Sequence, residues 1–432
     1  MNKGVMENIK SKIVGLIPTS WQVASIGEAC LEFVNGGTPS TKNAEYWKGS
    51  IPWITGADFL DSFHIGIVRR YITMNALNNS SSHLIPKGNI LLVTRTGVGK
   101  IAIAPFNVAI SQDITGLILR KDIFDVDFIY YCLQTLAEDF KKFNQGTSIN
   151  GIIRKDLERK IVPRPSLGEQ TIIASILRSV DKVIEKTEAA IEKYKAIKAG
   201  MMQDLFTRGI DTRSGKLRPT IEEVPELYKE SKLGWIPKDR EVTEFKSACL
   251  EFINGGTPST KNASNWVGTI PWITGADFLE SFEVGFIRRH INEDALRYSS
   301  SHLIREGNIL LVTRTGVGKL AIAPFDVAIS QDITGIILDL SQYCTEFFYY
   351  YLQVLVEDFK KMNQGTSING IIRSDLEATL ILKPSLDEQK QIAAVLNALD
   401  ENLKNEQSNL NKYRDLKRGL MADLLTGKVR IK

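Results

Sequence analysis

Cysteine and histidine are scarce in this chain of 432 residues, which contains four of each. The cysteines (Cys30, Cys132, Cys249 and Cys344) form no Cys-x-x-Cys pair, which argues against a zinc site or a disulfide framework. No apolar run approaches the roughly 18 residues needed to span a bilayer, and the polar N-terminus does not resemble a signal peptide. We therefore expect a cytoplasmic protein that binds no metal and contacts no membrane.

Several enzyme signatures are also missing. The stretch GVGK at 97–100 is not a phosphate-binding loop, because positions 94 and 101 are Thr and Ile instead of Gly and Ser or Thr. No dinucleotide-type glycine fingerprint follows a strand-like run, and the Asn-Pro-Pro and Asp-Pro-Pro tripeptides of amino-methyltransferases do not occur. No carboxylate–lysine cluster of a nuclease stands out. The sequence predicts a binding protein without catalysis of its own.

What the chain does contain is a long internal repeat. NGGTPSTKN at 35–43 returns at 254–262, a shift of 219 positions that holds without a gap over most of the chain. The stretch 91–116 differs from 310–335 only where Ile101 becomes Leu320 and Asn107 becomes Asp326. Because this unit is domain-sized, it predicts two copies of one module with the same surface chemistry. Two such surfaces suit a bipartite target.

Each copy divides into a globular part and a long helix. The globular parts, about 14–165 and 233–384, mix short apolar runs with Gly, Asn, Pro and Ser, which predicts an α+β domain with mixed helices and sheet. The segments that follow carry heptads, with Ile173, Val180 and Thr187 at position a and Val183 and Ile197 at position d, and Leu177, Ile184 and Ile191 widen this apolar stripe. About 40 residues make a helix of roughly 60 Å, which cannot bury its apolar stripe alone. We expect the two helices to pair antiparallel, with internal pseudo-two-fold symmetry.

The two helical segments open with PSLGEQTIIASILRSVDKVI and PSLDEQKQIAAVLNALDENL. These look like the opening of the conserved helices in specificity subunits of type I restriction–modification systems, which the chain resembles. GLIPTSWQV and GWIPKDREV resemble the entry to their target-recognition domains, and NQGTSINGIIRKDL resembles the segment that closes one. The expected order is recognition domain 1–165, central helix 166–207, linker 208–232, recognition domain 233–384 and C-terminal helix 385–427.

The resemblance implies a subunit that binds double-stranded DNA and holds two modification subunits. Those partners would bind S-adenosylmethionine and methylate adenine, and restriction subunits join some such complexes; no cofactor is expected on this chain. Recognition domains of this family often differ and read unlike half-sites, whereas here they are nearly the same. We therefore expect an interrupted palindrome.

Base and phosphate contacts should come from polar side chains on loops. Arg95 suits guanine O6 and N7, and Gln112 suits adenine N6 and N7; their copies are Arg314 and Gln331. The other candidates of the first copy, suited to phosphates or to either role, are Lys42, Lys100, Asn144, Gln145, Thr147, Ser148, Asn150 and Arg154. Their copies are Lys261, Lys319, Asn363, Gln364, Thr366, Ser367, Asn369 and Arg373.

Structural readings and a second function stay open at this stage. Thr38 and Asn43 are also residues that make turns, and Asp113 fits a loop acceptor or a partner for Arg95. The net charge of +4 is only mildly basic, so any positive field facing DNA must be local. The alternative function is a protein-binding scaffold with duplicated interaction domains.

Overall fold

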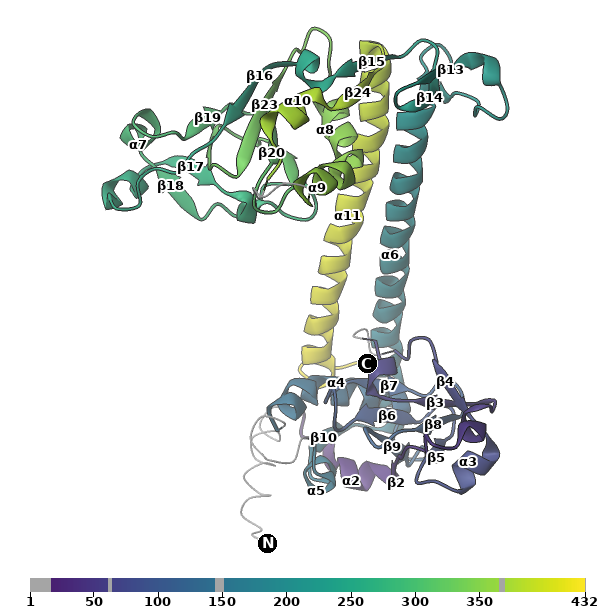
Figure 1. The fold of residues 1–432 in the computed structure, drawn as a ribbon. Coiled ribbons are helices and arrows are strands. Elements are labelled where there is room, and N and C mark those ends of the chain that lie inside the picture. The colour runs from purple at the N-terminus through teal and green to yellow at the C-terminus, as the bar shows by residue number, and fades with distance from the viewer. Residues whose placement is uncertain (1–16, 61–63, 144–150, 365–369, 432) are drawn as a thin grey trace. The chain divides into compact units, whose positions relative to one another are not determined.

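The computed structural model describes residues 17–60, 64–143, 151–364 and 370–431 and forms two compact units. The first comprises residues up to Ala189 together with Ser408–Lys432, and the second comprises Ala190–Gln407. Each unit therefore contains one globular domain and a part of both long helices (Figure 1). Among the residues described, no helix is long and apolar enough to cross a membrane.

In the first unit, short strands form two four-stranded sheets and one strand pair. The strands are β1 (Gln22–Ser25), β2 (Cys30–Asn35), β3 (Ile51–Ile54), β4 (Arg70–Ile72), β5 (His83–Ile85), β6 (Ile90–Val93), β7 (Ile101–Ile103), β8 (Val108–Ile110), β9 (Ile114–Leu119) and β10 (Ile161–Arg164). The helices are α2 (Ile26–Ala29), η1 (Ala44–Trp47), η2 (Gly56–Asp58), α3 (Met74–Asn78), α4 (Val126–Phe143) and α5 (Arg154–Glu158). The sheets have the orders β2-β9-β6-β7 and β4-β3-β8-β5, and β1 pairs with β10.

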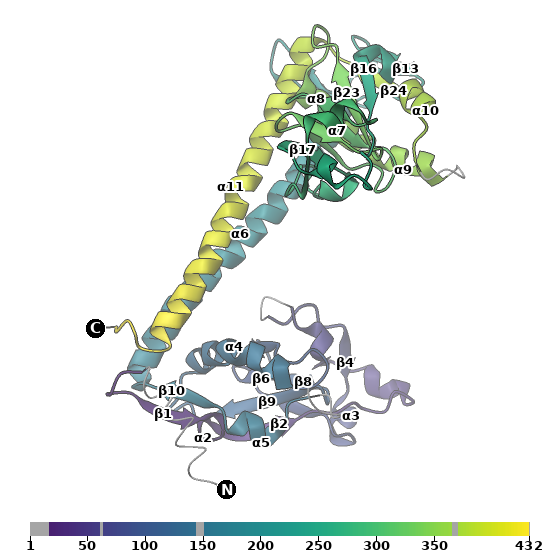
Figure 2. The ribbon, with the colours of Figure 1, turned by 90° about the vertical axis from the view of Figure 1, so that its left-hand side faces the viewer.

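The sheet β2-β9-β6-β7 lies between two apolar layers. On one face Ile90 and Leu92 pack with Phe128 of α4, and Figure 2 shows this helix lying over β6 and β9. On the other face Leu91 and Val93 pack with the core of the second sheet. Alternate residues of β6 are thus buried on both sides, which explains why NILLV reads as a continuous apolar run. The expected α+β class is confirmed.

The second unit repeats this arrangement. Its strands are β15 (Glu241–Glu244), β16 (Cys249–Asn254), β17 (Ile270–Ile273), β18 (Arg289–Ile291), β19 (His302–Ile304), β20 (Ile309–Val312), β21 (Leu320–Ile322), β22 (Val327–Ile329), β23 (Ile333–Leu338) and β24 (Leu380–Lys383). Its helices are η4 (Phe245–Ala248), η5 (Ala263–Trp266), η6 (Gly275–Asp277), α7 (Glu293–Arg297), α8 (Thr345–Val354), α9 (Val356–Gln364) and α10 (Arg373–Ala378). The sheet orders β16-β23-β20-β21 and β18-β17-β22-β19 are those of the first unit.

The long helices α6 (Leu167–Thr207) and α11 (Leu386–Leu424) pack antiparallel. In the first unit Lys417 Nζ lies 2.7 Å from Asp181 Oδ1, and Arg414 Nη2 lies 2.7 Å from Glu188 Oε1. Residue numbers therefore decrease along α11 in the direction in which they increase along α6. In the second unit Lys198 Nζ lies 2.6 Å from Asp400 Oδ1. The expected antiparallel pair is confirmed.

Each globular core also takes in the end of the helix that began in the other copy. Leu424 and Leu425, at the end of α11, are buried in the core of the first unit. Leu205 and Phe206, at the end of α6, are buried in the core of the second. The exchange is reciprocal, as the internal pseudo-two-fold symmetry expected from the repeat requires.

The heptad register assigned from the sequence is wrong in one respect. Val183 and Ile197, expected at position d of the seam, are each 40% exposed, whereas Leu177 and Ile191 are 0% and 5% exposed. The buried stripe instead runs through Ile173, Leu177 and on in alternating steps of four and three. The a positions and the residues expected only to widen the stripe, Leu177 and Ile191, therefore form the buried seam, and the expected d positions lie at its exposed edge.

The glutamine of each EQ pair fastens its helix to the globular domain. Gln170 is fully buried; its Oε1 accepts from the Asp125 backbone nitrogen at 2.9 Å, and its Nε2 donates to the Ile123 and Pro165 carbonyls. Gln389 makes the corresponding three bonds in the second unit. A buried amide with every bond made fixes the angle at which the helix leaves its domain.

The segment 208–232, expected to be a polar linker, is folded against the second unit. It contains β11 (Ile210–Asp211), β12 (Lys216–Leu217), η3 (Pro225–Leu227) and β13 (Tyr228–Ser231), and β13 pairs with β14 (Gly234–Pro237). Arg218 of this segment donates to Glu388 at the start of α11 at 2.5 Å. The segment therefore contributes to the second unit beyond connecting it.

Candidate nucleic-acid interface

Several loops meet at one end of the sheet β2-β9-β6-β7. Gly36, just after β2, donates its backbone N–H to Ile114 at the start of β9, and Thr94, just after β6, donates to Asp113. Ile152 donates to the Thr94 carbonyl and so brings the segment before α5 to the same place. The second unit repeats these bonds from Gly255, Thr313 and Ile371. Loops that are distant in sequence thus form one surface in each unit.

The two glycines of the NGG turn allow this close approach. A Cβ on Gly36 would lie 2.2 Å from the Ser111 carbonyl oxygen, and one on Gly37 would lie 2.0 Å from Ser81 Oγ. No side chain fits there, so the turn sits directly on the loop that carries Gln112. Both copies contain these two glycines, and in both the backbone after the first strand lies in contact with neighbouring loop residues.

Arg95 and Gln112, the candidates for base contact, lie together on this surface and are exposed. The side chain of Arg95 has no hydrogen bond or ion pair within the described part of the chain, so its five donors are available. Thr38 Oγ1 donates to Gln112 Oε1, and Thr257 donates to Gln331 in the second unit. Thr38 therefore orients the amide of Gln112.

The cationic candidates are less uniform. Lys42 is exposed on the turn after β2, but Lys100 Nζ donates to the Phe59 carbonyl at 3.0 Å and is half-buried. Arg154 donates to Glu158 at 2.7 Å and its guanidinium lies 5.2 Å from the Phe33 ring centroid. The second unit behaves likewise: Lys261 is exposed, Lys319 bonds the Phe278 carbonyl, and Arg373 bonds Glu377. These contacts give Lys100 and Arg154 roles inside their own domain.

Part of the predicted set lies outside the described residues. This holds for Asn144, Gln145, Thr147, Ser148, Asn150, Thr366, Ser367 and Asn369, and for the side chains of Asn363 and Gln364. The described end of the first segment, Gly151, lies against Arg95, since a Cβ there would come within 3.2 Å of Arg95 Cγ. The segment therefore rejoins the structure at the candidate surface.

Two exposed arginines, Arg69 just before β4 and Arg70 at its start, were not predicted from the sequence as site residues. Arg69 Nε donates to Asp58 Oδ1 at 2.6 Å; burial alone would raise the pKa of Asp58, but the bonds from Arg69 and Thr55 lower it below its ordinary value. Arg70 instead lies over two tryptophan rings. The available signal was the pair RR, which both copies keep while Tyr71 beside it becomes His290.

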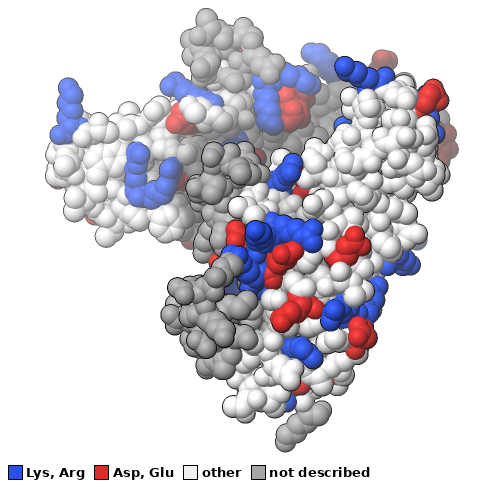
Figure 3. Space-filling view, turned by 90° about the horizontal axis from the view of Figure 1, so that it is seen from below, with Lys and Arg blue, Asp and Glu red and all other residues white. Residues whose placement is uncertain are grey.

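The charge on one face of the molecule is mixed in sign. On the face displayed in Figure 3, Lys and Arg are interspersed with Asp and Glu, with no continuous field of one sign. This face therefore offers no broad positive potential to an anionic ligand.

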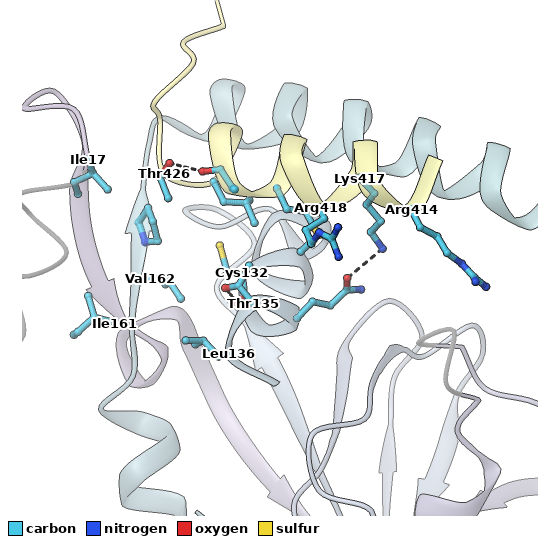
Figure 4. A pocket seen from close by; sticks show the side chains of 15 residues that line it. Ile17, Cys132, Thr135, Leu136, Ile161, Val162, Arg414, Lys417, Arg418 and Thr426 are labelled. Atoms are coloured by element: carbon cyan, nitrogen blue, oxygen red, sulfur yellow. Dashed lines mark hydrogen bonds between the residues drawn. The ribbon is translucent and has the colours of Figure 1, made fainter. Parts of the chain in front are cut away.

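A cavity of about 670 Å³ lies elsewhere in the first unit, between α4, β10 and the end of α11 (Figure 4). Lys417 bridges its wall by donating to Gln134 at 3.2 Å. At the positions of Cys132 and Leu425, the second unit carries Tyr351 and Phe206, whose rings pack 5.4 Å apart. The cavity thus follows from smaller side chains at a helix junction and is separate from the loop surface.

Comparison with known proteins decides the family. A family model described as "Type I restriction modification DNA specificity domain" matches residues 18–193 and again residues 237–412. The chain belongs to this family. It is a specificity subunit of type I restriction–modification systems, and each copy of the repeat corresponds to one recognition domain with the start of its helix.

Relatives and a solved structure agree with this assignment along the whole chain. The type I restriction enzyme MjaIX specificity subunit of Methanocaldococcus jannaschii is 34% identical over 436 residues, which cover 98% of this chain and 96% of the relative. The MjaVIII specificity subunit of the same organism is 25% identical over 438 residues, 99% and 97% of the two chains. The crystal structure of an S subunit from M. genitalium matches with a TM-score of 0.60 at 16% identity over 95% of this chain and 96% of that one, which shows the shared fold.

Proposed function

We propose that this specificity subunit reads a bipartite DNA target made of two identical, inverted half-sites, and that it does so without catalysis of its own. The observation that supports this most is the duplicated surface. Arg95 and Gln112 are exposed in the first unit, and their copies Arg314 and Gln331 are exposed in the second. Each glutamine also accepts the same hydrogen bond from a threonine hydroxyl. Identical readers select identical sequences. The reciprocal exchange of helix ends supports an inverted orientation of the two.

Arg95 and Gln112 are the proposed base readers. A bidentate contact is worth about 1–3 kcal/mol of discrimination, so two per half-site suffice for a selective protein. Lys42 and the polar residues of 144–150 are proposed to add phosphate or base contacts at the same surface, with their copies doing so at the other half-site. Half-site centres about one helical turn apart, on the order of 10 base pairs, would let both domains meet one face of the duplex.

The paired helices are the proposed binding site for two modification subunits. Those subunits would bind S-adenosylmethionine and carry out the methyl transfer, and restriction subunits would join the complex. Ile172 and Val183 on α6 and Leu416 on α11 remain 47%, 40% and 51% exposed despite the pairing. Exposed apolar side chains on a helix surface suit a protein partner. The specificity subunit would then contribute binding and geometry only.

The helices should also set the distance between half-sites. Removing one heptad from each at matched positions, 191–197 and 403–409, keeps the buried stripe in phase and shortens the pair by about 10 Å. Selection of bound duplexes from a random pool should then return the same half-sites with a spacer shorter by about three base pairs, at 3.4 Å per pair. An unchanged spacer, or altered half-sites, contradicts the proposal. Deleting the heptad from α6 alone is the control, since it leaves α11 one heptad longer than its partner and should lower the melting temperature.

A further inference from the structure

Two tryptophans frame an arginine on the edge strand of each second sheet. Trp47 and Trp53 meet edge-to-face, with centroids 5.1 Å apart, and the Arg70 guanidinium lies 5.9 Å from one centroid and 5.7 Å from the other. Arg70 is also the cross-strand partner of Trp53 in the β3–β4 ladder. A planar guanidinium held over aromatic faces is fixed in orientation while its N–H groups remain free at the edge.

No carboxylate of the described residues occupies those N–H groups. The Arg70 side chain has neither a hydrogen bond nor an ion pair there, in contrast to its neighbour Arg69, which is bound to Asp58. Arg70 instead lines a surface depression of about 540 Å³ together with Thr41, Trp47, Gly49, Arg69 and Tyr71. An unpaired, oriented cation beside a threonine hydroxyl is suited to a phosphate oxygen.

The second unit contains the same arrangement of one arginine and two tryptophans. Arg289 lies 5.8 Å from the Trp266 centroid and 5.7 Å from that of Trp272, and the two rings are 5.0 Å apart. The surroundings have diverged, since Lys48 is replaced by Val267 and Tyr71 by His290. Exposed positions tolerate substitution most easily. An exposed arginine kept on the same frame in both copies therefore points to a shared ligand.

The frame is tied to the turn that carries Thr38. Trp53 Nε1 donates to the Gly37 carbonyl at 3.1 Å, and Trp47 Nε1 donates to the Ser40 carbonyl at 3.2 Å. Thr38 in turn bonds Gln112, one of the proposed base readers. Arg70 and the reading surface are thus held in a fixed relation through three hydrogen bonds and the short segment 37–40.

We propose that the Trp-framed guanidinium of Arg70, and of Arg289 in the second unit, is a phosphodiester-binding site that holds the DNA backbone beside the base-reading loops. The ligand class is a phosphate of the duplex, and Thr41 lines the same depression as Arg70. The site fixes the register of each domain on its half-site and carries no sequence preference. This inference rests on the proposed function, because it presupposes that these domains bind DNA.

The test replaces both arginines by glutamine, Arg70→Gln with Arg289→Gln, in the full chain assembled with its modification subunits. Duplex affinity is measured over a series of salt concentrations. Each phosphate contact contributes about 0.9 to the slope of log affinity against log salt, so the slope should fall by about two. Affinity for matched and mismatched duplexes should fall by the same factor, and the half-sites enriched from a random pool should stay the same.

A matched control is available within the repeat. Lys121 is exposed at the opposite end of the sheet, after β9, and the second copy carries Leu340 in its place. Lys121→Leu removes a positive charge in a form that the fold already accepts, and it should leave the slope unchanged. Arg70→Lys with Arg289→Lys keeps the charge and should keep most of the slope, which covers the case in which the glutamine variant fails to fold.

Three outcomes overturn the inference. The first is an unchanged salt slope in a folded double-glutamine variant. The second is a salt slope that falls by about two in the double-lysine variant, which keeps the charge. The third is a change in the enriched half-sites, which would make Arg70 a base reader. Failure of the proposed function looks different: the unmodified complex would then enrich no sequence at all.

Discussion

Replacing Glu388 with glutamine is expected to lower the free energy of unfolding by about 3–5 kcal/mol, because it leaves a buried arginine without its counter-charge. Glu388 is 2% exposed and Arg240 is 1% exposed, with Arg240 Nη2 2.6 Å from Glu388 Oε1. Glu388 also accepts from Arg218 and from the Ile210 backbone nitrogen, so it joins the linker segment and the end of α6 to the start of α11. The melting temperature and the denaturant midpoint measure the effect.

The first copy supplies the control for this prediction. The equivalent Glu169 accepts from Trp21 Nε1 at 3.0 Å and pairs with Arg430, which is 45% exposed, so no buried cation depends on it. Glu169→Gln keeps an acceptor for Trp21 and should cost about 1 kcal/mol or less. Equal losses in the two variants would contradict the account of the second junction.

The same cluster predicts how stability depends on pH. Burial would raise the pKa of Glu388, but hydrogen bonds from Arg218 and the charges of Arg240 and Arg218 lower it below its ordinary value of 4.5. A carboxyl with a depressed pKa in the folded chain stabilises fully above its unfolded pKa and loses that contribution as the pH falls through its folded value. Acid destabilisation below about pH 4.5 should therefore be weaker in Glu388→Gln than in the unmodified chain.

Replacing Arg95 and Arg314 together by alanine is expected to abolish most sequence selectivity while leaving the fold intact. Each loss should cost about 1–3 kcal/mol of discrimination at one half-site, a factor of about 5–150. Both side chains are exposed and make no hydrogen bond or ion pair with the described residues, so the melting temperature should change little. Selection from random duplexes and competition between matched and mismatched duplexes measure the effect.

The single variants sharpen this test. Because the two surfaces are copies, Arg95→Ala and Arg314→Ala should each relax one half-site and by a similar factor. Binding to the modification subunits should persist in both. If DNA selectivity survived in the double variant while assembly with partners failed, the protein-binding scaffold would become the better account of the function.

The repeat made most of the second unit predictable from the first. A shift of 219 positions carries every strand of the two four-stranded sheets from one unit to the other in the same order. The location of Arg95 and Gln112 at loop positions followed from the turn residues beside each apolar run. That these loops meet depends on the order β2-β9-β6, which local patterns do not encode.

Contacts between distant segments account for what the sequence did not predict. The bond from Lys100 to the Phe59 carbonyl spans 41 residues, so local sequence could not show that this side chain also braces its own domain. The place of Arg70 over Trp53 arises only when β3 pairs with β4. The seam of α6 was misassigned because Leu177 and Val183 both fit a heptad, and only packing against α11 distinguishes them.

Sequencing the methylated adenines in cells that express this chain with its modification partner tests the central claim most directly. The account predicts a single interrupted palindrome, in which the methylated adenines lie in two identical half-sites of opposite orientation separated by a constant spacer. Two unlike half-sites, or two half-sites in the same orientation, would contradict it.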